Sequence, residues 1–398
     1  MKNKALILLG IFSCSLMSLI AGAQQLPQLK PYSTVIPAPD FDFADAEATA
    51  LAGTGLQVWT TTLKATKNGK SYPMTMVGQS PFSSTTTTNV PVAIVPVIVN
   101  INGTAFNPTV ADTTCMVAPN NVPLTVFRQS PLFGNATYTM GGVNVGNTQY
   151  IDAFQRANFW TAISPNYHTR LSPITVKTAQ TYKVPVGSGA VYSTSSFGNG
   201  GCGPKKNPLG KFGLVDINAF DAWANKTGLL VASATSNELV IFLIYNVVMS
   251  NGAPLTSNCC ILGYHGATAG PPGGKTYSPM EFDQTGIFGS TTTDTSIASH
   301  EIGEWMDDPY GSNATPAWGG IGQVSGCQAN LEDGDPLSNN LAPSVKMSNN
   351  YIYHLQELAY FSWFFNAKTT ASISAGGKFS NAGKFIGPSK VCPPGGTF

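Results

Sequence analysis

The spacing of hydrophobic positions changes along the chain and predicts both strands and helices. Residues Tyr72 to Val77 and Val90 to Ile101 are apolar and rich in β-branched side chains, with prolines placed as at strand starts or edges. Leu239 to Met249 is a continuous apolar run, short enough to be a buried strand. These runs predict a core sheet that is mostly antiparallel or mixed.

Helical spacing occurs in three other segments. Residues 148–163 place apolar side chains toward one side, and residues 215–227 predict a second helix. Residues 291–307 begin with Thr and Asp as cap candidates and end before Pro309, which predicts a helix of about four turns. The glycine-rich stretch 263–275 is expected to be a loop. The chain is therefore expected to be an α+β protein with the 292–307 helix packed across the sheet.

The N-terminus has the layout of a secretory signal peptide. A short positive stretch, Met1 to Lys4, precedes the apolar run Ala5 to Ile20 and the sequence Ala21-Gly22-Ala23. The run is shorter than the roughly 20 residues that a spanning helix needs, and it ends at an A-x-A cleavage site. We therefore expect residues 1–23 to be removed and the mature protein to be secreted or periplasmic. No later segment is long and apolar enough to predict a membrane span.

The remaining chain divides by composition into three parts. Residues 24–60 contain several prolines and few paired apolar positions, which predicts an N-terminal arm that packs loosely. Residues 61–375 hold the strand and helix patterns and are expected to form one domain. Residues 376–398 are a C-terminal tail that includes Cys392. The sequence predicts no oligomeric state.

Composition limits the partners of the protein. Charged residues make up only 10% of the chain, against roughly 25% in soluble proteins generally. The formal net charge is +1, so there is no basic patch of the kind that binds nucleic acid. We expect no nucleic-acid partner.

The cysteines favour disulfides in an exported chain. Without Cys14 of the signal peptide, an even set remains: Cys115, Cys202, Cys259, Cys260, Cys327 and Cys392. Because a ring between adjacent cysteines is strained, Cys259 and Cys260 are each expected to pair with a different partner. A thiolate metal site is the alternative, but the chain has no C-x2-C pair.

The segment SHEIGEWMDDP, residues 299–309, carries the chemistry. Positions i and i+4 lie on one face of a helix, so His300 and Glu304 can point at the same ion while Glu301 projects beside them. This is the zinc motif H-E-x-x-H with Glu304 in place of the second His, and a carboxylate is also a zinc ligand. Asp307 lies near the same face. Such a group of acids in a chain poor in charge repels unless a cation or a basic partner neutralises it.

Candidates for a third ligand lie outside this helix. Glu332 and Asp335 follow a loop and are the first candidates. His265 and His354 are possible additional ligands, although a lone His in an apolar stretch such as that around His354 is more often a hydrogen-bonded core residue.

Several strings in this region resemble a group of secreted bacterial zincin-like proteins with an H-E-x-x-E helix. They are SHEIGEWMDDP, then Trp318 to Gly322, the GCQ at 326–328 and LEDGDPL at 331–337. More distantly, the segment from Cys259 to His265 is similar to one in Exordium-type, phosphate-induced plant cell-wall proteins. The resemblance covers roughly residues 240–365 and implies a zincin-like domain over 61–375, with a strand preceding the metal-binding helix. Glu304 departs from the metallopeptidase pattern.

Two functions follow from these observations. In the first, the protein is a secreted zinc-dependent hydrolase, a metalloprotease acting on a peptide or protein substrate, with Glu301 as the catalytic base and zinc held by His300, Glu304 and either Glu332 or Asp335. In the alternative, it is a non-catalytic cell-surface or wall-associated binding protein, and the same acids hold a structural ion or none. Oxygen-rich ligand sets favour calcium, whereas His300 favours zinc.

Overall fold

The computed structural model describes residues 29–36, 55–198, 200–271, 273–367, 372–390 and 392. The predicted signal peptide lies outside this described part of the chain. Within it, no helix is long and apolar enough to cross a membrane.

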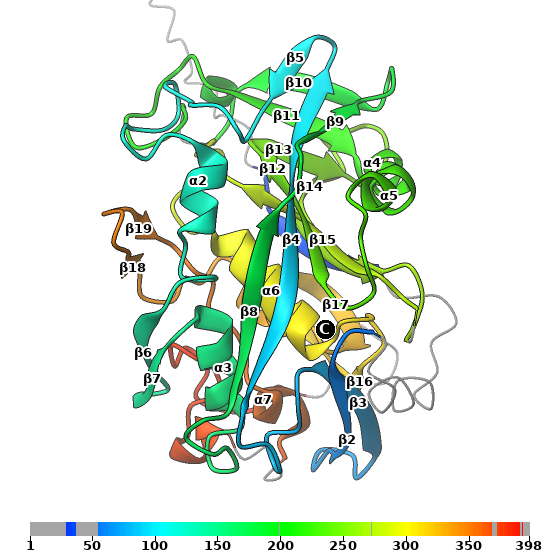
Figure 1. Cartoon of the computed structure of the whole chain (residues 1–398), viewed down its shortest axis with the longest axis vertical. Coiled ribbons are helices and arrows are strands. Elements are labelled where there is room, and N and C mark those ends of the chain that lie inside the picture. The colour runs from blue at the N-terminus through cyan, green and yellow to red at the C-terminus, as the bar shows by residue number, and fades with distance from the viewer. Residues whose placement is uncertain are drawn as a thin grey trace, which may run out of the picture.

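A large mixed sheet dominates the fold (Figure 1). Its main path runs in the order β10 (Gly189–Ser193), β11 (Lys211–Asp216), β13 (Val247–Ser250), β14 (Cys259–Ala267), β15 (Thr276–Phe282), β12 (Leu239–Tyr245), β4 (Thr87–Ile101) and β5 (Thr104–Phe106). Off this path, β1 (Tyr32–Ile36) pairs with β14, while β8 (His168–Val176) and β9 (Gln180–Lys183) pair with β4. The strand β14 is antiparallel to both β13 and β15, whereas β12 is parallel to β15 and β4. The prediction of an α+β protein is confirmed, and of the two sheet types expected, mostly antiparallel or mixed, the sheet is mixed.

Smaller elements surround this sheet. Four hairpins pair β2 (Val58–Lys64) with β3 (Ser71–Val77), β6 (Ala136–Met140) with β7 (Val143–Thr148), β16 (Ala314–Ile321) with β17 (Val324–Asn330), and β18 (Val345–Lys346) with β19 (Ile352–Tyr353). The α-helices of the described residues are α2 (Pro123–Arg128), α3 (Tyr150–Asn158), α4 (Ile217–Trp223), α5 (Leu229–Val231), α6 (Ser296–Asp307) and α7 (Phe361–Phe365). Single helical turns of other types occur at Thr194–Ser196, Ala224–Gly228, Asp335–Leu337 and Ile373–Gly376.

The run from Leu239 is a buried strand, as predicted, because both faces of the sheet are covered. Alternate residues of β12 point to opposite faces: one set packs with α3 and α6, and the other packs with α4 and α5. The run is not one strand, however. Asn246 adopts a positive φ of 51°, a conformation that Asn tolerates, and the chain turns there from β12 into β13. The pattern of apolar residues does not reveal this turn.

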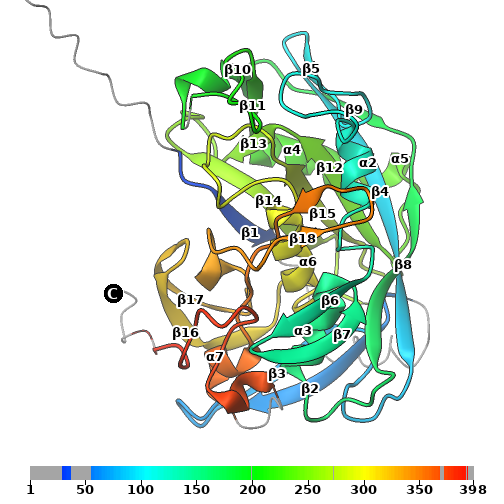
Figure 2. The same ribbon diagram turned by 90° about the vertical axis from the view of Figure 1, so that its left-hand side faces the viewer.

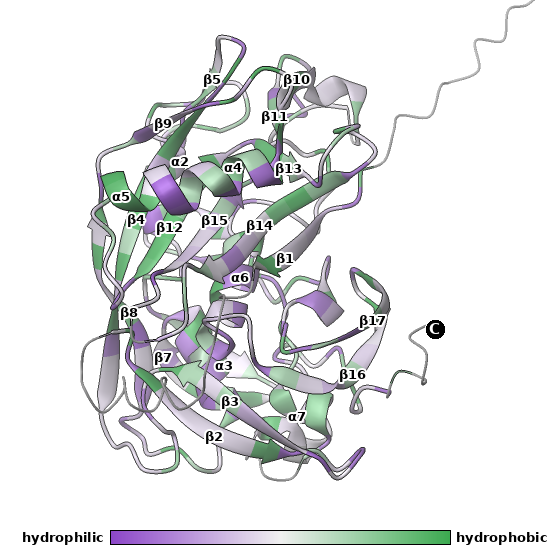
Figure 3. Cartoon of the chain, turned by 90° about the vertical axis from the view of Figure 1, so that its right-hand side faces the viewer, coloured by the Kyte–Doolittle hydropathy of each residue, from purple (hydrophilic) through white to green (hydrophobic). Residues whose placement is uncertain are grey.

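The helix α6 lies near the centre of the molecule. It packs on β14 and β15 and also contacts β3 and α3 (Figure 3). All twelve of its residues are buried, polar ones included. The helix begins at Ser296 rather than at 291, because Asp294 has a positive φ and its carboxylate binds His354 instead of capping the helix. A charged helix that is buried all round needs a specific reason for its polar side chains.

Two sequence-based expectations about local structure are wrong. The glycine-rich stretch does not start as a loop, since β14 continues to Ala267. The N-terminal arm is not loosely packed in its described part: β1 joins the large sheet through a parallel ladder with β14. The C-terminal tail is fixed to the body by Cys392, which is bonded to Cys327, and by Ser389, whose amide donates to the carbonyl of Trp363.

The cysteine pairing differs in part from the expectation. The six cysteines after Cys14 form three disulfides. Two of them, Cys115 with Cys202 and Cys327 with Cys392, join distant parts of the chain. The prediction that Cys259 and Cys260 reach different partners is wrong, because these neighbours pair with each other across a cis peptide bond. The other four cysteines of the described residues are paired with one another, which leaves Cys259 and Cys260 to each other.

Candidate metal centre

The predicted helix places His300, Glu301 and Glu304 in the interior, beside strand β14 and the loop that follows β17. The Nε2 atom of His300 lies 2.9 Å from Oε1 of Glu304. The same nitrogen lies 3.5 Å from Oδ1 of Asp335. Ligand atoms of these three residues all lie within 4.8 Å of one another, so they can hold one cation.

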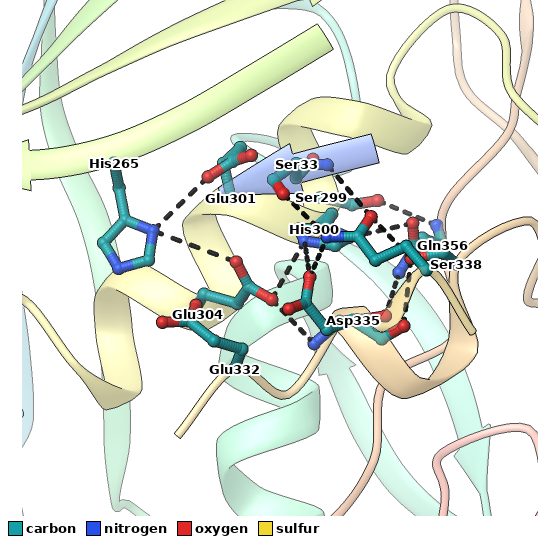
Figure 4. Close-up of polar contacts among 12 residues, drawn as sticks. Ser33, His265, Ser299, His300, Glu301, Glu304, Glu332, Asp335, Ser338 and Gln356 are labelled. Carbon is teal, nitrogen blue, oxygen red and sulfur yellow. Dashed lines mark hydrogen bonds and ion pairs between the residues drawn. The ribbon is translucent and has the colours of Figure 1, made fainter. Parts of the chain in front are cut away.

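A second group of potential ligands shares Glu304. His265 of β14 has its Nδ1 atom 3.3 Å from Oε2 of Glu301 and 3.8 Å from Oε2 of Glu304. This group also lies within 4.8 Å and is fully buried. Figure 4 shows Glu304 between His265 and His300, with Glu332 beneath it. The two oxygens of Glu304 therefore face the two histidines separately.

Gln356 fixes the orientation of the His300 ring. Its amide nitrogen donates to the carbonyl oxygen of Gly334 at 2.7 Å, which directs its amide oxygen to Nδ1 of His300 at 3.0 Å. An oxygen can only accept, so Nδ1 carries a hydrogen and donates it. In neutral His300 the lone pair is then on Nε2, the atom that faces Glu304 and Asp335. Metal-ligating histidines characteristically have such a partner on the other ring nitrogen.

The two ligand groups and Glu332 form one cluster, made of His265, His300, Glu301, Glu304, Glu332 and Asp335. Two glycines make the close packing of this cluster possible. A Cβ at Gly334 would lie 2.5 Å from Nδ1 of His300, closer than such atoms ever approach. The amide of the same glycine donates to Oε1 of Glu304 at 3.1 Å. A Cβ at Gly263 would lie 2.8 Å from Cγ of Glu301. A side chain at Gly263 or Gly334 would therefore force Glu301 or His300 to move.

The carboxylate of Asp335 is held by two glutamines of the β16–β17 hairpin. Nε2 of Gln328 donates to Oδ2 of Asp335 at 2.9 Å, and Nε2 of Gln323 donates to Oδ1. Glu332 lies beside Glu304. Oε1 of Glu332 accepts a hydrogen bond of 2.7 Å from the side-chain nitrogen Nδ2 of Asn330. The sequence predicted Glu332 and Asp335 as ligand candidates, and the structure brings both to the helix.

Burial changes the proton affinities of the cluster. It raises the pKa of Glu301 to about 8, although the charge of His300 and a hydrogen bond with the Ser33 side chain oppose the rise. The pKa values of Glu304 and Glu332 are also raised, first by burial and then by neighbouring carboxylates, with His300 opposing the shift only at Glu304. Burial lowers the pKa of His265. At His300 burial acts in the same direction, but the charge of Glu304 and hydrogen bonds to Asp335 and Glu304 raise the pKa well above 6.5.

The cluster lacks the cationic side chains that would balance its acids. In the described part of the chain, every ion pair has a histidine as its positive partner, so no Lys or Arg neutralises these carboxylates. Oε1 of Glu301 and Oε2 of both Glu304 and Glu332 are buried and have no hydrogen-bond partner among the described residues. Buried carboxylates without partners are costly unless a proton or a cation reaches them. The donor set fits a metal cation.

Two other candidate residues lie elsewhere. Asp307 is on the helix but about 10 Å farther along its axis than His300. Its carboxyl contacts Asp333 and accepts a hydrogen bond from Gln155, so it does not join the metal-ligand groups. His354 pairs with Asp294, with Nδ1 and Oδ2 2.6 Å apart, and lines a separate cavity of about 430 Å³. It is not among the grouped ligands.

Sequence reasoning missed the three glutamines that support the cluster, Gln323, Gln328 and Gln356. Uncharged side chains in loops and strands give no signal of their own. Only Gln328 lies within one of the strings that carry the family resemblance. Their roles appear only once the hairpin and the segment after β19 are placed around α6.

The chain was compared with known proteins. No protein-family model matches it, and no similar curated protein or solved structure was found. The site must therefore be interpreted from its own geometry.

Proposed function

We propose that the protein is a secreted zinc-dependent hydrolase that cleaves peptide bonds. The observation that carries the proposal is the orientation of His300, whose Nε2 faces Glu304 and Asp335 while Gln356 accepts from Nδ1. The imidazole of His300 in the ligand set favours zinc over calcium, which prefers oxygen ligands alone. The resemblance to H-E-x-x-E zincin-like proteins supports the same assignment.

The proposed roles follow from the positions of the side chains. Zinc supplies a Lewis acid and lowers the pKa of a bound water to about 7. His300, Glu304 and Asp335 would hold the ion. Glu332, which lies beside Glu304, is the alternative to Asp335 as the third ligand. Oε1 of Glu301 has no hydrogen-bond partner in the described structure, so this oxygen is free to accept a proton from a water molecule beside the ion. His265 lies 3.3 Å from the other oxygen of Glu301 and orients that carboxylate.

One observation favours the second candidate, a non-catalytic binding protein with a structural ion. Each of the histidines and carboxylates of the cluster is no more than 5% exposed. Structural zinc sites are closed, whereas catalytic sites keep one position open to water and substrate. The two functions therefore differ in whether the cluster becomes accessible.

Elemental analysis of the purified mature protein tests the metal directly. We expect one zinc per chain, lost in His300→Ala and retained in the control His354→Ala, which removes a histidine outside the cluster. If His300→Ala retains zinc, the assigned ligand set is wrong.

Glu301→Gln tests the enzyme hypothesis, since this change keeps the size of the side chain but removes the base. The variant should fold, retain zinc and lose on the order of 10²-fold or more of its hydrolytic rate, measured on fluorescein-labelled casein. If Glu301→Gln is as active as the wild-type protein and His300→Ala unfolds more easily, the ion is structural.

A further inference from the structure

Strand β1 lies directly over the candidate metal centre. It pairs in parallel with β14, with Ser33 opposite Gly263 and Val35 opposite His265. Gly263 is the residue against which Glu301 packs, and the Ser33 side chain lies close enough to Glu301 to lower the pKa of that carboxyl. Figure 2 shows β1 in dark blue beside β14, above the β16–β17 hairpin. This segment of the N-terminal arm therefore covers the proposed catalytic base.

Backbone contacts hold β1 in place, together with the packing of Tyr32 against the core. Of the side chains described from Tyr32 to Val35, only that of Ser33 is buried. Gln323 binds both backbone groups of Ser33: its Oε1 accepts from the amide at 2.9 Å, and its Nε2 donates to the carbonyl at 2.7 Å. Main-chain hydrogen bonds do not depend on which side chains the strand carries. The contacts of β1 are therefore those of a peptide bound by β-strand addition.

Gln323 also connects this backbone contact to the metal centre, since its Nε2 donates to Asp335. A cleft of about 290 Å³ lies between β1 and the β16–β17 hairpin, and Glu332 and Asp335 form part of its wall. This cleft reaches the cluster and runs along β1. A peptide that replaced β1 would lie with its backbone on Gln323 and one residue against Glu301.

We propose that the edge of β14 is the docking site for an extended peptide substrate, and that β1 is an internal occupant which must leave before substrate binds. The peptide runs parallel to β14, as β1 does. It carries a small residue at the position of Ser33, where Gly263 and Glu301 leave little room, and tolerates varied side chains on either side. This inference rests on the proposed function and accounts for the closed state of the cluster.

The test compares full-length mature protein with Ser33→Pro, because proline cannot donate the hydrogen bond that Gln323 accepts. Thr34→Ala is the matched control, since it changes a neighbouring, partly exposed side chain. The first readout is the rate at which EDTA withdraws zinc. The second is the affinity for a fluorescein-labelled peptide of residues 30–36, measured by fluorescence polarisation, with the same peptide carrying proline at Ser33 as the control ligand.

We expect zinc withdrawal to be about tenfold faster in Ser33→Pro than in wild type or Thr34→Ala, the effect of losing about one hydrogen bond. We also expect the peptide to bind Ser33→Pro at least tenfold more tightly than the proline-bearing control peptide does. If zinc is bound but leaves both proteins at the same rate, or both peptides bind equally, β1 is a permanent strand and the inference fails. If Ser33→Pro does not fold, β1 is likewise a permanent strand and the inference fails.

Failure of the proposed function gives a different result. In that case neither protein retains zinc, while selective binding of the 30–36 peptide by Ser33→Pro still establishes the docking edge.

Discussion

Oε1 of Gln356 lies 3.0 Å from Nδ1 of His300, and the amide nitrogen of the same glutamine is bound to the carbonyl of Gly334. This pair of contacts decides which nitrogen of His300 can bind a metal. Gln356→Met should keep the volume of the side chain but remove the acceptor, and zinc affinity should fall by about 10- to 100-fold. Competition with a chelator measures the change. Gln356→Glu keeps an acceptor for Nδ1 and should lose less affinity; equal affinity in Gln356→Met and wild type would show that Gln356 does not position the ring.

Gly334→Ala tests the packing of the same ring without removing any ligand. The added Cβ would meet Nδ1 of His300 at 2.5 Å, so the ring or the loop must move. We expect a loss of about 1–3 kcal/mol in the free energy of unfolding, together with weaker zinc binding. Urea denaturation and metal titration measure the two effects. Gly387→Ala is the control, because a Cβ there meets nothing within 4 Å, and it should change neither quantity.

The disulfide between Cys327 and Cys392 closes a loop next to the centre. Cys327 is adjacent in sequence to Gln328, which binds Asp335. Replacing both cysteines by serine should lower the free energy of unfolding by about 4 kcal/mol and also weaken zinc binding. The matched control replaces Cys115 and Cys202, whose disulfide is not part of the cluster. That variant should lose a similar amount of stability with unchanged zinc affinity; a loss of affinity in both would indicate general destabilisation.

His354 should make stability depend on pH. Its hydrogen bond with Asp294 raises the pKa of the folded-state imidazole above 6.5, against the opposing effect of burial. A raised histidine pKa stabilises the folded state fully below the unfolded value of 6.5, and the contribution is lost as the pH rises through the folded-state pKa. Wild type should therefore lose more stability than His354→Gln between pH 6 and pH 8, as followed by urea denaturation. Parallel curves for the two proteins would contradict this assignment.

The mature N-terminus is predicted from the sequence alone. Export should remove residues 1–23, so mass spectrometry of the secreted protein should find Gln24 as the first residue. An intact Met1 in exported material would rule out the signal peptide.

The sequence by itself predicted the elements whose periodicity was strong. The buried run from Leu239 and the helix that carries His300 and Glu304 were both identified from residue spacing. Local periodicity is sufficient there because alternate or fourth-neighbour positions share a face in any strand or helix. The glycine content of residues 263–275 gave the wrong structure at His265. A glycine-rich strand cannot be distinguished from a loop by its composition.

The tertiary structure alone decided how the candidate centre is assembled. His265 comes from β14, Asp335 from the segment after β17, and Gln356 from the segment after β19, and no spacing rule connects them. The need for glycine at positions 263 and 334 is also set by the tertiary structure. The lack of a Cβ matters only where another segment of the chain touches these residues. The coverage of Glu301 by Ser33, 268 residues away by subtraction of their numbers, depends on the pairing of β1 with β14. Contacts between residues far apart in sequence follow from how the whole core packs, and a local pattern of residues does not encode that packing.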